Sequence, residues 1–179
     1  MRAWPLLLLA VGTITPGVAQ SVKRAYVGND GLVHISLTGR AEFVAPKEIR
    51  LGSERIGDAE DVQASVEPPV VALDGRTVAW VVNFPNCCTS YPIPLVLVVF
   101  RDGAILRRFG GMPIWKFSFE SGADRLAIYM DTLHGQSAAW CQLREVASGK
   151  LLDEWRVRDG KPIPHWAKPF EAELKAASK

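Results

Sequence analysis

Short apolar runs separated by glycine-containing turns make up most of the chain. Several of these runs alternate apolar and polar side chains, as strands with one buried face do. Asp-Gly or Ser-Gly pairs, such as Asp30-Gly31, Asp74-Gly75 and Ser148-Gly149, stand between them and accept the positive φ that tight hairpins need. The sequence therefore predicts an all-β fold of antiparallel hairpins, with strands at 32–37, 77–84, 94–100, 104–109, 114–119, 125–130, 138–146 and 150–155.

The turn glycines recur with a regular spacing. Gly75 and Gly122 are 47 residues apart, and Gly103 and Gly149 are 46 apart, so each interval holds two hairpins and four strands. Radially repeated four-stranded sheets have this period and strand count. A third, degenerate copy of this four-stranded repeat is expected over residues 23–66. We predict two to three propeller-blade-like units of four-stranded antiparallel meander, arranged as an incomplete propeller or a sandwich.

The residues that fill these units resemble a known repeat family. The stretch 113–155 resembles a blade of the WD40-like or TolB-like β-propeller repeats, with Leu126-Ala127 and Val78-Ala79 as the second-strand pair and 145–151 as the closing hairpin. The resemblance covers about 90 residues and carries no catalytic motif. Propellers usually have four to eight blades. The resemblance therefore implies either a sandwich or a homodimer in which a partner copy covers the open edges.

The first residues have the layout of a secretory signal peptide. A single charge at Arg2 precedes a short apolar core, and small residues follow up to Ala19. We expect residues 1–19 to be a signal peptide cleaved after Ala19, so that the protein is secreted or periplasmic. Residues 20–157 then form the β-repeat domain.

The last residues, 158–179, read as a connector followed by a short helix. Pro169 suits a helix start, acidic residues follow in the first turn, and Lys175 lies near the end. Phe170, Leu174 and Ala177 fall on one face of this predicted helix at 169–177. We expect Trp166 and Phe170 to lay it against the β-body.

The charge balance argues against two classes of partner. Lys and Arg number 21 against 19 Asp and Glu, and the basic residues do not cluster. We therefore expect no nucleic-acid partner. Outside the N-terminus the longest apolar run, 94–100, is strand-sized, so no membrane span is expected either.

The three cysteines leave their pairing open. Cys87 and Cys88 are adjacent, and their Cα atoms are about 3.8 Å apart, closer than the usual disulfide range. A strained Cys87-Cys88 ring, a bridge from one of them to Cys141, and free thiols remain alternatives. Cys141 itself falls within a strand, where a small thiol packs well.

Two connections occupy corresponding places in neighbouring units, one at 84–94 and one at 129–140. Matching loops on a repeated β-scaffold emerge at the same end and often carry function. The candidate site has Cys87 and Cys88 as a disulfide or thiol pair and Tyr91, Asp131 and His134 as a binding surface.

Catalytic motifs are not found in the sequence. No serine sits in a Gly-x-Ser-x-Gly setting, and His34, His134 and His165 lack metal-ligand spacing, so we predict no cofactor and no metal. Trp80, Trp115 and Trp155 are expected in the core. The favoured function is an exported, non-enzymatic binding module for a protein or small ligand. The alternatives are a redox protein using Cys87-Cys88 and a hydrolase or metal enzyme with a site near Asp131 and His134.

Overall fold

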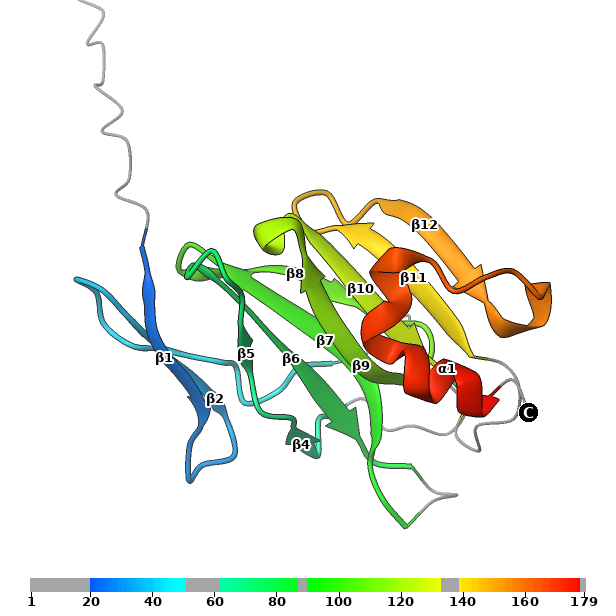
Figure 1. Cartoon of the computed structure of the whole chain (residues 1–179). Coiled ribbons are helices and arrows are strands. Elements are labelled where there is room, and N and C mark those ends of the chain that lie inside the picture. Colours follow the sequence, from blue (N-terminus) through cyan, green and yellow to red (C-terminus); the bar gives the residue numbers. More distant parts are fainter. Residues whose placement is uncertain (1–19, 51–61, 87–89, 133–138, 178–179) are drawn as a thin grey trace, which may run out of the picture.

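Three antiparallel sheets and a short C-terminal helix form the structure, as the sequence predicts (Figure 1). The computed structural model describes residues 20–50, 62–86, 90–132 and 139–177. Sheet 1 contains β1 (Val22–Val27), β2 (Val33–Leu37) and β3 (Phe43–Val44). Sheet 2 contains β4 (Ser65–Val66), β5 (Val70–Val71), β6 (Thr77–Phe84), β7 (Ile93–Arg101) and β8 (Ala104–Phe109). Sheet 3 contains β9 (Ile114–Glu120), β10 (Arg125–Met130), β11 (Trp140–Glu145) and β12 (Leu151–Arg156).

The predicted hairpin turns lie where the sequence places them. Between β7 and β8, Asp102 and Gly103 both have positive φ, 54° and 90°. Consecutive positive φ angles are the mark of a two-residue hairpin turn whose twist matches that of its strands. Between β9 and β10 the chain turns through the short 3-10 segment η1 (Ser121–Ala123).

Sheet 3 is a four-stranded meander as predicted, whereas sheet 2 has five strands. Sheet 2 joins β4 and β5 to β6, and then β6, β7 and β8 in series, whereas sheet 3 is a simple meander in the order β12-β11-β10-β9. The expected copy over residues 23–66 is wrong in its second half. Among the described residues sheet 1 has three strands, and β4 pairs with β6 in sheet 2 instead. Residues 51–61 of this expected copy lie outside the described residues.

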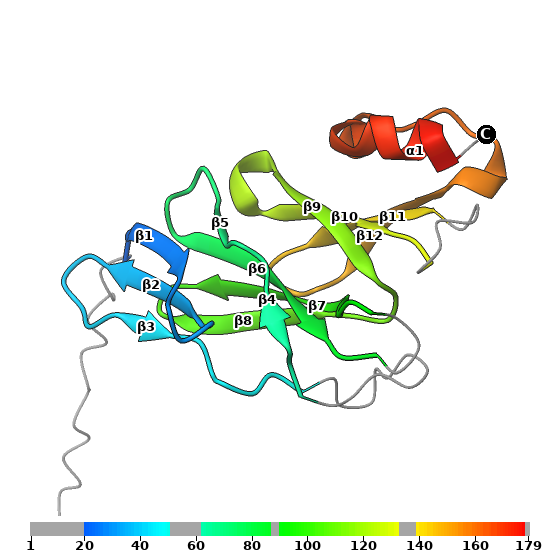
Figure 2. The ribbon, with the colours of Figure 1, turned by 90° about the horizontal axis from the view of Figure 1, so that it is seen from below.

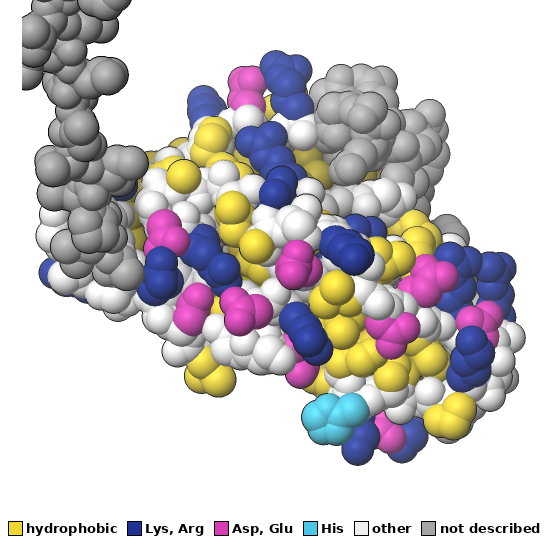
Figure 3. Space-filling view, turned by 90° about the horizontal axis from the view of Figure 1, so that it is seen from above, with side chains coloured by type: hydrophobic (Ala, Val, Ile, Leu, Met, Phe, Trp, Pro, Cys, Tyr) yellow, Lys and Arg dark blue, Asp and Glu magenta, His cyan; other side chains and the backbone are white. Residues whose placement is uncertain are grey.

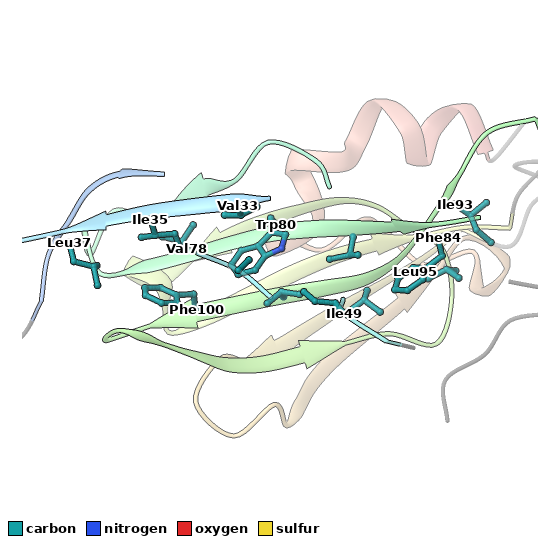
Figure 4. Packing of buried hydrophobic residues seen from close by; sticks show 14 residues of the cluster. Val33, Ile35, Leu37, Ile49, Val78, Trp80, Phe84, Ile93, Leu95 and Phe100 are labelled. Atoms are coloured by element: carbon teal, nitrogen blue, oxygen red, sulfur yellow. The ribbon is translucent and has the colours of Figure 1, made fainter. Parts of the chain in front are cut away.

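The sheets stack face to face in chain order, with sheet 2 in the middle (Figure 2). This position explains the uninterrupted apolar sequences of β6 and β7, since every residue of β6 and the first eight of β7 are buried. On one face Trp80 and Phe100 lie in one apolar cluster with Val33 and Ile35 of β2, and Phe84 lies farther along the same cluster beside Leu95 (Figure 4). On the other face, Val81, Leu97 and Val99 pack against Leu126 and Ile128 of sheet 3.

The C-terminal segment covers the outer face of sheet 3. The 3-10 helices η2 (Val157–Asp159) and η3 (His165–Phe170) lead into α1 (Glu171–Ala177). Phe170 and Leu174 are buried against Tyr129, Cys141 and Trp155, and the Phe170 and Tyr129 rings stack at 5.9 Å. The predicted helix and its docking by Phe170 are therefore confirmed, although α1 begins two residues later because η3 precedes it.

The opposite end of the stack has a polar surface. Along β2 the buried residues alternate with His34 and Ser36, which point outward. A polar outer face on a terminal unit keeps a stacked β-structure from adding further units. On the face seen in Figure 3, basic and acidic side chains are interspersed over the surface.

Within the described part of the chain, no helix has the length and apolar content needed to cross a membrane.

Candidate functional site

A cleft of about 440 Å³ lies where the C-terminal segment meets the adjoining edges of sheets 2 and 3. One wall comes from β9, from Ile114 to Ser118. The facing wall comes from β6, the start of β7, and the Glu67-Pro68 pair between β4 and β5. Pro169 and Phe170 of η3 close one side.

The lining residues show that the cleft runs along the edge of β9. Ile114 and Phe117 belong to the cluster between sheets 2 and 3, whereas Lys116 pairs with Glu173 on the side of the helix. Consecutive strand residues point to opposite faces of a sheet. A cavity that touches both sets of side chains must therefore lie at the strand's edge, next to its backbone.

Trp115 is the most exposed aromatic residue of this cleft. Its register partner is missing: Tyr129 pairs with Lys116 and Met130 pairs with Ile114, so Trp115 is the extra residue of a β-bulge. Bulges redirect a side chain out of the regular alternation. Trp115 is 38% exposed, and its indole N–H donates to the carbonyl oxygen of Asp131 at 3.3 Å. The prediction that Trp115 lies in the core is therefore wrong, whereas Trp80 and Trp155 are buried as predicted.

A buried amide forms the polar part of the facing wall. Asn83 is 8% exposed, and its Nδ2 donates to the Glu67 carboxylate at 3.0 Å and to the Ser65 hydroxyl at 3.2 Å. Both amide hydrogens are thus occupied by neighbours within the described residues. These contacts fix the amide plane, and they hold Glu67 at the rim of the cleft.

The Lys116 ammonium donates to the Glu173 carboxylate and ties β9 to α1. The hydrogen bond from Lys116 lowers the pKa of Glu173 below its ordinary value. Because both charges are satisfied by each other, this end of the cleft presents a paired ion rather than a free cation.

Of the predicted binding surface, the structure describes Tyr91 and Asp131. Tyr91 is 45% exposed, but Asp131 is only 3% exposed. The Asp131 carboxylate accepts hydrogen bonds from the Tyr129 hydroxyl at 3.2 Å and from the Thr132 N–H at 2.7 Å. Burial, followed by the nearby Asp131 charge, raises the pKa of Tyr129. Asp131 therefore lies inside the fold, and the prediction that it belongs to an exposed binding surface is wrong.

Cys87, Cys88 and His134 lie outside the described residues, so the predicted thiol pair and its histidine stay predictions. Cys141 is buried and free, which contradicts the alternative that joins it to Cys87 or Cys88. Burial raises the pKa of the Cys141 thiol to about 12. A thiol with so high a pKa is not a nucleophile near neutral pH.

A second polar cluster lies on the outer face of sheet 1 and was not singled out from the sequence. His34 Nδ1 lies 3.1 Å from the Glu42 carboxylate, and its Nε2 lies 3.0 Å from that of Asp30. Hydrogen bonds to Glu42 and then to Asp30 raise the pKa of His34. The ring also stacks on Tyr26 at 5.2 Å. Within the described ranges, no group of three His, Cys, Asp or Glu residues is arranged to hold a metal ion.

The sequence contains a partial signal for the cleft. Pro92 and Pro94, from the connection singled out as functional, line it. The other wall comes from β9, which the sequence shows only as a strand. The bulge that exposes Trp115 depends on the register of β9 with β10, which local patterns do not fix.

Comparison with known proteins gives no relative. No family model, no curated protein and no solved structure matches the chain.

Proposed function

We propose that this chain is an exported, non-enzymatic binding module that holds its ligand in the cleft beside β9. The signal-like residues 1–19 support export. Support for a binding scaffold comes from sheet 2, with five strands, and sheet 3, with four strands, which pack face to face through one apolar cluster. Rigid β-scaffolds commonly carry binding sites at their edges and loops.

The proposal rests mainly on the exposed indole of Trp115 within a concave site. Ligand sites are typically concave and mostly apolar, with a few fixed polar groups. Here Trp115 and the neighbouring prolines supply the apolar surface, and the Asn83-Glu67 pair supplies fixed polar atoms. Tryptophan is common among the residues that dominate binding energy at interfaces, and the hydrogen bond from its N–H fixes the Trp115 ring within the cleft.

Binding is tested by presenting arrays of synthetic peptides and of glycans to the wild-type chain and to two variants. Trp115→Ala removes the anchor, and Leu73→Ala is the control, because Leu73 is 98% exposed and does not line the cleft. We expect at least one ligand class to bind the wild type and Leu73→Ala equally, and Trp115→Ala about tenfold or more weakly. Equal binding by all three proteins, or no binding in either array, would refute the proposal.

Export is tested separately by the N-terminus of the secreted protein. Mass spectrometry should find Gln20 as the first residue after passage through a secretory membrane. A retained Met1 would contradict the export part and leave the binding part standing.

A further inference from the structure

We propose that the ligand is an extended peptide segment of another protein, which adds as a strand to the free edge of β9. This inference rests on the binding function proposed above and names its ligand class.

The first support is the position of β9 at the end of sheet 3. The sheet order is β12-β11-β10-β9, so among the described strands β9 pairs with β10 alone. Backbone groups on its other side make no hydrogen bond with any described residue over 114–120. Unpaired N–H and C=O groups along a strand edge form a template for another strand.

The second support is that this edge is reachable. The cleft follows Ile114 to Ser118, which is about 13 Å of extended backbone. Four or five residues of a peptide therefore fit beside it in register. Alternate side chains of the peptide would point toward sheet 2 and toward η3.

The third support is the composition of the surrounding walls. Pro68, Pro92 and Pro94 lie opposite β9, and Pro169 lies at the side. Proline has no N–H, so these residues offer the incoming backbone no competing donor. The hydrogen-bonding groups of a bound peptide are thereby directed to β9.

The fourth support is a place for one anchoring side chain. Trp115 stands at the bulged end of the edge, with its ring orientation set by the bond to Asp131. A proline or aromatic side chain can stack on this ring. Because Lys116 and Glu67 already have partners at Glu173 and Asn83, a peptide of low charge suits the cleft better than a strongly charged one.

Strand addition has a signature that other peptide modes lack. A strand directs every second N–H toward its neighbour. The residues of a bound peptide therefore fall into two alternating sets, and N-methylation should weaken binding for one set only. The probe is the tightest heptapeptide from an array of Val- and Thr-rich sequences that carry one Pro, Tyr or Trp. Fluorescence polarisation measures the affinity of the full chain for the unmodified peptide and for two versions of it, each with one alternating set of residues N-methylated.

We expect one N-methylated set to weaken binding at least tenfold and the other to leave it nearly unchanged. Trp115→Ala should weaken the parent peptide about tenfold or more, and Leu73→Ala should not. Circular dichroism of both variants checks that they remain folded. Equal effects of the two methylated sets overturn strand addition.

The array also separates this inference from the function on which it rests. Trp115-dependent binding of glycans without binding of peptides overturns the peptide ligand but leaves the binding module standing. Absence of binding in both arrays overturns both.

Discussion

The Nη2 atom of Arg101 donates a hydrogen bond of 2.7 Å to the carbonyl oxygen of Ala123, and so joins the end of β7 in sheet 2 to the turn that opens β10 in sheet 3. The same guanidinium donates from Nε to the Thr77 hydroxyl at 2.7 Å. Ala123 is fully buried and has a φ of 94°, which alanine rarely adopts. This bond therefore helps to hold a strained turn against the neighbouring sheet.

Replacing Arg101 by methionine should lower the free energy of unfolding by about 2–3 kcal/mol, because two hydrogen bonds to a charged, partly buried group are lost. Urea denaturation measures the change. The matched control is Arg76→Met. Arg76 pairs with Asp102, but both side chains are more than 40% exposed, so this change should cost clearly less stability than Arg101→Met. Equal losses for the two variants would show that the bond to Ala123 contributes nothing.

Asp74 reports on the same junction. Burial alone would raise its pKa, but hydrogen bonds from the Thr77 hydroxyl and from the backbone of Arg76 and Thr77, together with the Arg101 charge, bring it below the ordinary value. A carboxyl with a lowered pKa stabilises the fold above its unfolded pKa, and this contribution is lost as the pH falls through the folded pKa. Asp74→Asn should therefore reduce the acid dependence of stability below about pH 4, as seen in denaturation at a series of pH values. An unchanged acid slope would contradict this.

His34 should make stability depend on pH in the opposite sense. Since its folded pKa is raised above 6.5, its contribution is complete below that value and is lost as the pH rises through the folded pKa. Wild-type protein should lose more stability between pH 6 and pH 9 than His34→Gln does. An NMR titration should also show that Glu42→Gln lowers the His34 pKa. A His34 pKa at or below 6.5 in the wild type would contradict the geometry.

Phe170 should be essential to the outer layer of the fold. It is 1% exposed and packs on Tyr129, so Phe170→Ala should cost about 3–5 kcal/mol by leaving a cavity over sheet 3. Thermal and urea denaturation measure the loss. Leu73→Ala, at a fully exposed site, should change stability by less than about 0.5 kcal/mol. A loss below about 1 kcal/mol for Phe170→Ala would mean that the C-terminal segment does not cover sheet 3 in solution.

The Cys141 thiol should be inert in the folded protein. Its burial and its raised pKa of about 12 keep it protonated and out of reach of reagents. In a Cys87→Ser, Cys88→Ser variant, a disulfide reagent at pH 8 should label no thiol until denaturant is added. Rapid labelling of this variant without denaturant would contradict the buried position.

The sequence by itself determined the local elements of this protein. Alternating or continuous apolar runs identified β2 and the seven strands from β6 to β12, and the turn glycines identified their reversals, because both signals arise from neighbouring residues. The strand β1 was missed because its run of Lys23, Arg24 and Tyr26 lacks a clear apolar face, and the two-residue strands β3, β4 and β5 are too short to show a period.

Only the tertiary structure decided how those elements share their faces. The bulge that turns Trp115 outward and the pairing of β4 with sheet 2 rather than sheet 1 both depend on partners distant in sequence. Strand register and stacking are set by these long-range contacts, and a shift of one residue reverses which side chains are buried. For this reason the cleft beside β9 could be found only in the folded structure, whereas the longer strands and the turns could be predicted from the sequence.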